Sequence, residues 1–204
     1  MKTLTKELQN SITPNDALTI LKEGNKRFVN NYKFGRNLKD QVIQTSTGQF
    51  PFAVVLSCID SRVPAELVYD QGIGDLFSVR VAGNIINEDV LGSIEYGCKV
   101  AGSKIVVILG HTKCGAVTAA CNNIELGNIT SLLAKIKPAV DLFRTANKIV
   151  VGELIEKVAL ENIKLSRKNI LENSSILKEM NDNGEIIIVG ASYDVETGSI
   201  VYFE

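Results

Sequence analysis

Short runs of hydrophobic residues are the clearest pattern along this chain. Residues 52–57, 105–109 and 186–189 are almost continuously apolar, and residues 76–80 are largely so. Runs of this length are typical of strands that are buried on both faces of a parallel sheet. The pattern therefore predicts four strands in a central, mostly parallel sheet.

Apolar residues recur at helical spacing between these strands. In residues 89–102, the side chains of Ile94, Cys98 and Ala101 fall on one helical face. A strand, a helix and a second strand at this spacing form a βαβ crossover. Further helices are predicted at residues 13–30, 116–122, 129–145 and 151–172.

The two ends of the chain differ from this alternation. Residues 1–35 predict an N-terminal helical arm, and the polar residues 31–51 predict a long irregular connection. Near the other end, residues 196–198 are typical of a hairpin turn, so residues 199–202 predict an antiparallel edge strand. We expect a three-layer α/β fold in a single domain spanning residues 1–204.

Composition narrows the classes of function. The chain has 204 residues, with 22 Lys and Arg against 23 Asp and Glu, so its net charge is −1. No basic surplus favours nucleic acid or anionic lipid as a partner. No apolar run approaches the roughly 20 residues that cross a bilayer, and the first residues do not resemble a signal peptide. These features predict a cytoplasmic protein whose four cysteines are reduced thiols.

Two of those cysteines and the only histidine carry the candidate chemistry. Cys58 follows the first strand, His111 follows the third, and Cys114 comes three residues later in His-x-x-Cys spacing. The carboxyl ends of parallel strands are where open α/β sheets bind ligands. Three good zinc ligands with an open fourth position are the pattern of catalytic zinc. Cys98 and Cys121 instead share helical faces with apolar residues, so we expect them in the core.

A charged pair follows the first candidate ligand. Asp60 lies two residues after Cys58, and Arg62 lies two residues further. Such a carboxylate can complete the metal shell or accept a hydrogen bond from a metal-bound water, and the guanidinium keeps it ionised. The plainer alternative is a solvated surface ion pair.

With these residues assembled, the chain resembles the β-class carbonic anhydrases. The segments Cys58-Ile59-Asp60-Ser61-Arg62-Val63 and His111-Thr112-Lys113-Cys114-Gly115 are similar to that family's two motifs, at the family's separation. The likeness runs from about Phe28 to the C-terminus. It implies one zinc ion per chain, held by the two cysteines and the histidine. It also implies reversible hydration of carbon dioxide to bicarbonate and a proton by a zinc-bound hydroxide, with Asp60 and Arg62 as the catalytic dyad.

The resemblance implies a substrate pocket as well. Gln49 is similar to the family's substrate-orienting amide, Phe77 and Tyr96 to its aromatic walls, and Gly115 belongs to the second motif. In relatives the aromatic walls are shared across a subunit interface, so we expect a homodimer or a dimer of dimers. Without the resemblance, both aromatics would be predicted as core residues.

Three departures from the family pattern bear on function. Ala116 replaces a common second glycine, and Val81 replaces a common asparagine. The chain has no tryptophan, so the bicarbonate-inhibited behaviour of some relatives, which uses one, is not expected.

Three alternatives stay open from the sequence. Proteins that hydrolyse carbon disulfide share the metal motif. A zinc-stabilised regulatory module would need no dyad. A nucleotide site at Gly72-Ile73-Gly74 lacks the third glycine and does not follow a strand directly.

Overall fold

A five-stranded mixed sheet forms the centre of the protein. In the computed structural model, which describes residues 3–144 and 152–203, the strand order is β2-β1-β3-β4-β5. The strands are β1 (Ala53–Ser57), β2 (Leu76–Arg80), β3 (Ile105–His111), β4 (Ile187–Tyr193) and β5 (Ile200–Phe203). The first four are parallel and β5 runs antiparallel to β4, which confirms the predicted sheet.

The burial of each strand follows from its place in this order. Every residue of β1 and β3 is buried, because each has a strand on both sides and helices over both faces. In the edge strand β2 only Leu76 is buried, and the residues after it alternate between half-buried and exposed positions. Successive residues of β1 and β3 pack into different cores: Val55 and Val107 lie in one, and Val54 and Val106 in the other.

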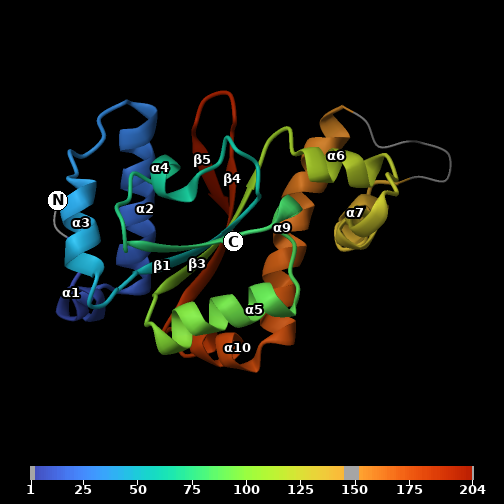
Figure 1. Ribbon diagram of the computed structural model, residues 1–204. Coiled ribbons are helices and arrows are strands. Elements are labelled where there is room, and N and C mark those ends of the chain that lie inside the picture. The colour runs from blue at the N-terminus through green and yellow to red at the C-terminus, as the bar shows by residue number, and fades with distance from the viewer. Residues whose placement is uncertain (1–2, 145–151, 204) are drawn as a thin grey trace.

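Helices cover both faces of the sheet, giving the three layers that were predicted. Figure 1 shows α1 to α4 on one side and α5, α9 and α10 on the other. The first group comprises α1 (Lys6–Ser11), α2 (Pro14–Val29), α3 (Leu38–Thr45) and α4 (Ala65–Val68). The second group comprises α5 (Glu88–Glu95), which continues into a π-helical turn (Tyr96–Val100), α9 (Glu153–Asn173) and α10 (Ser175–Asp182). Three shorter helices follow β3: α6 (Gly115–Cys121), α7 (Gly127–Leu133) and α8 (Lys137–Asp141). None of the helices in the described ranges is long and apolar enough to cross a bilayer.

The N-terminal helices are bound closely to the rest of the chain. Gln9 Nε2 donates to the carbonyls of Pro51 (2.7 Å) and Ala101 (2.9 Å), just outside the start of β1 and the end of the π-helical turn. The helix α2 approaches Tyr69 so closely that a Cβ at Gly24 would lie 1.9 Å from the Tyr69 carbonyl oxygen. Any larger residue at position 24 would push α2 away from the end of α4.

A buried carboxylate fixes the segment that follows α2. Asp70 is only 3% exposed and accepts hydrogen bonds from the side chains of Arg27 and Arg36. The backbone N–H of Phe34 donates to the same carboxylate at 3.3 Å. Two guanidiniums therefore compensate the desolvation of one buried charge.

Parts of the predicted helix pattern were wrong. Residues 31–51 are not wholly irregular, because α3 lies within them. Its apolar residues Leu38, Val42 and Ile43 are exposed, so no stripe of core residues marks it in the sequence. The helix predicted at 129–145 is two helices, α7 and α8, and α1, α4 and α10 were not predicted. The ends of two predicted helices, Thr145 and Val151, lie outside the described residues.

Candidate metal centre

Three soft ligand atoms converge at the carboxyl end of the sheet. Cys58 directly follows β1, His111 is the last residue of β3, and Cys114 precedes the first residue of α6. All three are buried, and their sulfur and ring nitrogen atoms lie within 4.8 Å of one another. Because β1 and β3 are adjacent, with Ser57 opposite Leu109, Cys58 and His111 leave the sheet within one residue of the same level.

The loop between the two ligands of the second motif is held from several sides. Thr112 N donates to the Tyr193 carbonyl (2.9 Å), and Val195 N donates to Thr112 Oγ1 (3.1 Å), so the loop is joined to β4 and the hairpin. Lys113 adopts a left-handed backbone conformation (φ 54°), and its N–H donates to Glu156 Oε1 of α9 (3.0 Å). This conformation reverses the chain and brings Cys114 beside His111.

The polar atoms of His111 indicate which nitrogen faces the sulfurs. Nδ1 lies 2.9 Å from the Thr112 carbonyl, which can only accept, so Nδ1 donates. Nε2 is buried and has no hydrogen-bond partner among the described residues. Burial lowers the pKa of His111, but the Cys58 sulfur and the Thr112 carbonyl outweigh this effect and raise it. An unpartnered imidazole nitrogen beside two sulfurs is the arrangement that a metal ion would satisfy.

Without a metal ion, Cys58 and Cys114 shift each other's pKa through a shared hydrogen bond. A hydrogen bond from the Cys114 thiol lowers the pKa of Cys58, and the same hydrogen bond, with burial, raises the pKa of Cys114. The backbone N–H of Gly83 also donates to Cys58 Sγ at 3.3 Å. These shifts favour a thiolate at Cys58 and a thiol at Cys114, and a divalent cation would favour release of the second proton. Two sulfurs and one imidazole nitrogen fit zinc.

Asp60 and Arg62 form a forked ion pair beside this cluster. Arg62 donates from Nε to Oδ1 (2.9 Å) and from Nη2 to Oδ2 (2.8 Å), and its backbone N–H also donates to Oδ1 (2.9 Å). Asp60 Oδ2 lies 3.9 Å from His111 Nε2. The Arg62 hydrogen bonds hold the pKa of Asp60 far below its usual range. The Asp60 carboxylate, 17% exposed, thus lies beside the ligand cluster, while the Arg62 side chain on its other side is 48% exposed.

Within one chain, the predicted pocket residues Phe77, Tyr96 and Gln49 are not brought to the cluster. Phe77 lies opposite Val54 in the sheet, four residues before Cys58, a displacement of about 13 Å along the strand. Phe77 and Tyr96 contact each other edge to face, with centroids 6.3 Å apart, and Tyr96 is 55% exposed. Gln49 is also exposed. Gly115, in contrast, adjoins Cys114 at the first residue of α6.

Two supporting residues were missed by the sequence reasoning. Arg80 ends β2 and donates to the carbonyls of Cys58 (3.1 Å) and Asp60 (2.7 Å), which fixes the segment that carries both. Glu156 binds the backbone of the second motif from α9, as described above. A polar residue at the end of a strand was a usable signal for Arg80. No local pattern connects Glu156 to a loop more than 40 residues away.

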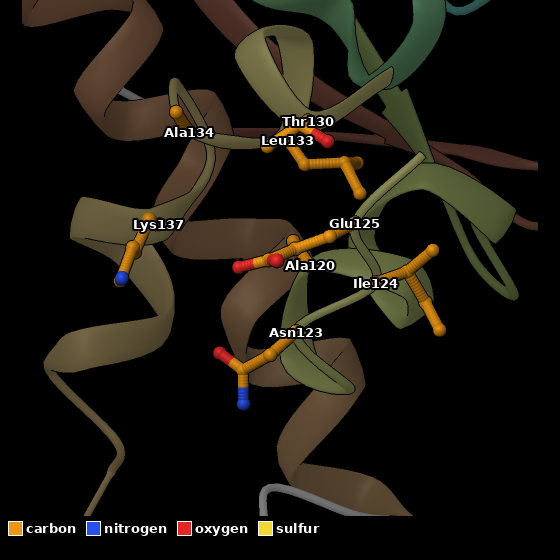
Figure 2. Close-up of a pocket in the computed structure, with 8 residues that line it drawn as sticks. All are labelled: Ala120, Asn123, Ile124, Glu125, Thr130, Leu133, Ala134 and Lys137. Carbon is orange, nitrogen blue, oxygen red and sulfur yellow. The ribbon is translucent and has the colours of Figure 1, made fainter. Parts of the chain in front are cut away.

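A separate hollow of about 110 Å³ lies where α6, α7 and α8 meet. Figure 2 shows its lining, which is formed by Ala120, Asn123, Ile124, Glu125, Thr130, Leu133, Ala134 and Lys137. None of the metal-binding candidates or the predicted substrate residues belongs to this lining.

Comparison with known proteins agrees with the site. Residues 53–200 match the family model described as "Carbonic anhydrase". The chain is 37% identical over 194 residues to "Carbonic anhydrase 2" of Mycobacterium tuberculosis, covering 92% of both chains. It is 34% identical over 194 residues to the carbonic anhydrase of Mycolicibacterium smegmatis, again covering 92% of both.

Solved structures give the same result. The β-carbonic anhydrase CcaA is 27% identical and superposes with a TM-score of 0.75, covering 92% of this chain and 95% of that one. The β-carbonic anhydrase CafA of Aspergillus fumigatus is 25% identical, with a TM-score of 0.73 and coverage of 93% and 90%. From its sequence motifs, its fold and these relatives together, the chain belongs to the β-carbonic anhydrase family.

Proposed function

We propose that the chain hydrates carbon dioxide reversibly to bicarbonate and a proton, with one zinc ion held by Cys58, His111 and Cys114. One observation carries this proposal: a carboxylate clamped by Arg62 lies 3.9 Å from the unpartnered Nε2 of a buried two-sulfur, one-nitrogen cluster. Zinc in that cluster supplies Lewis acidity that lowers the pKa of a coordinated water, an effect for which carbonic anhydrases with three histidine ligands are the standard example.

Asp60 acts as a fixed hydrogen-bond acceptor in this proposal. An ionised carboxylate can only accept, so it orients an O–H group beside the cluster with a lone pair turned toward the substrate. Arg62 occupies one side of both carboxylate oxygens and keeps the group ionised. The dyad thereby selects one orientation of the reacting water, which reduces the entropy lost in reaching the transition state.

The substrate pocket requires a second subunit in this proposal. Phe77 lies about 13 Å along the sheet from its own chain's cluster, and Tyr96, which contacts Phe77, is exposed. A homodimer that brings these aromatics and Gln49 to the partner's cluster would supply apolar walls and one amide donor. Carbon dioxide has no net charge, so such a pocket suits it. Three further points stay predictions. They are the association of two dimers into a tetramer, a single domain with residues 1–35 as a helical arm, and a cytoplasmic location.

Stopped-flow measurement tests the proposed function. Carbon dioxide hydration is followed with a pH indicator before and after removal of metal with a chelator, with zinc content measured in parallel. We expect catalysis in proportion to zinc content and its recovery when zinc is returned. A zinc-loaded chain that hydrolyses carbon disulfide but leaves carbon dioxide at its uncatalysed rate would contradict the proposal.

A further inference from the structure

The helix α9 carries two polar side chains inside an apolar stripe. Asn162 and Ser166 are each 3% exposed, while Val158, Ile163 and Ile170 on the same helix are fully buried. Buried polar groups need hydrogen-bond partners, and these two are one helical turn apart on one face. Both find their partners in a single turn next to the metal centre.

That turn spans Val81 to Asn84 and is held from α9. Asn162 Nδ2 donates to the Gly83 carbonyl (2.8 Å), and Ser166 Oγ donates to the Asn84 carbonyl (3.2 Å). Within the turn, Asn84 N donates to the Val81 carbonyl (2.9 Å). Gly83 and Asn84 both have left-handed backbones, with φ of 68° and 44°.

Glycine is required at the centre of this turn. Apart from its positive φ, a Cβ at position 83 would lie 2.6 Å from Ile136 Cδ1 and 3.4 Å from Ala116 Cβ. The turn therefore packs against α6 and the start of α8 with no room for a side chain. The Gly83 and Asn84 carbonyls are bound by α9, and the Gly83 N–H points to Cys58 Sγ at 3.3 Å.

A hydrogen bond to a ligand sulfur changes the Lewis acidity of the metal ion that the sulfur binds. An N–H donor draws electron density from the thiolate, so the thiolate donates less to the metal and the metal remains a stronger Lewis acid. Two thiolates together match the charge of a divalent ion, so a site of this kind gains most from such a donor. The Gly83 N–H and C=O lie in the two peptide planes joined at the Gly83 Cα, so a partner on the C=O restricts the direction of the N–H.

We propose that Asn162 is a positioning residue of the metal centre: it holds the Gly83 carbonyl so that the Gly83 N–H donates to the Cys58 sulfur. Ser166 supports the same turn through Asn84. The inference rests on the proposed function only in taking Cys58 as a metal ligand. It needs no assumption about the substrate.

The test reads the hydrogen bond directly. The protein is labelled with ¹⁵N and loaded with ¹¹³Cd, and the coupling between the Gly83 amide proton and the metal, transmitted through the N–H···S hydrogen bond, is measured by NMR. We expect a resolved coupling in the unmodified protein and its loss in the Asn162→Ala variant. We also expect that variant to release cadmium to a competing chelator about 10-fold faster.

Matched variants separate positioning from general stability. Asn169→Ala removes an amide from an exposed position of the same helix, and Ile170→Val removes a methyl from the same buried stripe. Both should keep the coupling. If Asn162→Ala does not fold, Asn162→Ser is the substitute, because its hydroxyl is too short to reach the Gly83 carbonyl.

Two outcomes would overturn the inference. One is the absence of a Gly83 coupling in the cadmium-loaded unmodified protein, and the other is a coupling of unchanged size in a folded Asn162 variant. A chain that binds cadmium, shows the coupling and loses it in the variant, but does not hydrate carbon dioxide, would contradict only the proposed function. A chain that binds no cadmium at the two cysteines would contradict both.

Discussion

Asp60 Oδ2 lies 3.9 Å from His111 Nε2, yet both oxygens of that carboxylate accept hydrogen bonds from Arg62. The carboxylate is therefore close to the ligand cluster but bound away from it. To become a ligand itself, Asp60 would have to exchange charge-assisted hydrogen bonds to Arg62 for a bond to the metal. The described conformation is the one in which Asp60 acts as an acceptor.

Replacing Asp60 tests that role. In Asp60→Asn the new amide can donate as well as accept, so it no longer selects one orientation of the reacting water. We expect zinc content to stay near one per chain while kcat/KM for carbon dioxide hydration falls by about 100-fold or more. Stopped-flow rates with parallel metal analysis measure both. A variant with full zinc and full activity would show that the dyad is only a structural ion pair.

The ligand assignment predicts that Cys114 and Cys121, seven residues apart, differ in their importance for zinc binding. Cys114→Ser replaces a thiolate ligand, whereas Cys121→Ala removes a buried sulfur from α6 outside the ligand cluster. We expect the first variant to lose most of its zinc on dialysis and the second to keep it. Metal analysis after dialysis against a weak chelator measures the difference. Equal retention of zinc by both variants would refute the assignment.

Glu156 should contribute to zinc affinity although it lies on α9, outside the ligand cluster. Its carboxylate binds the Lys113 N–H between two ligands, while Glu196 binds only the exposed Lys113 ammonium. We expect Glu156→Ala to weaken zinc binding by about 10-fold, because the left-handed turn at Lys113 loses its partner. Glu196→Ala, the matched control, should leave zinc affinity nearly unchanged. Competition with a chromophoric chelator gives both affinities, and identical values would contradict the prediction.

Asp70 should make stability depend on pH in a defined window. Burial raises the pKa of Asp70, but the hydrogen bonds from Arg27 and Arg36 outweigh it and lower the pKa below 3.8. A lowered folded-state pKa stabilises the protein above the unfolded-state value, and this contribution is lost as the pH falls through the folded-state value. Asp70→Asn should therefore reduce the free energy of unfolding by about 3–5 kcal/mol at pH 7.

Urea unfolding at a series of pH values measures that effect. The difference between the unmodified protein and Asp70→Asn should be constant from pH 7 to 5 and should shrink only below about pH 4. Exposed Glu179 can be changed to Gln as a control, with little expected effect. A difference that already shrinks above pH 5 would exclude Asp70 as its source.

The single histidine predicts how the product proton leaves. His111 is the only imidazole of the chain, and it lies in the ligand cluster, so it is not free to shuttle protons. Turnover at saturating carbon dioxide should therefore increase with buffer concentration. Turnover that does not respond to buffer would indicate an internal proton acceptor.

Local patterns were sufficient for the strands and for the three residues that cluster at their carboxyl ends, but not for the supporting contacts. Buried strands are visible because every residue of β1 and β3 is apolar up to the ligand-bearing ends. The helix α3 was missed because its apolar residues are exposed, and periodicity reports on burial. The contact between Asn162 and Gly83 joins residues far apart in the chain, so neither residue carries a sign of it in its own segment.

The pairing of β1 with β3 has a consequence for folding. Ser57 faces Leu109, so a slip of one residue would turn each side chain to the opposite face of the sheet and shift Cys58 by about 3.3 Å relative to His111. A misaligned sheet could not assemble a tetrahedral metal site. Only chains with the correct register of β1 and β3 would bind the metal tightly. The metal content of newly folded protein would therefore report the register of the sheet.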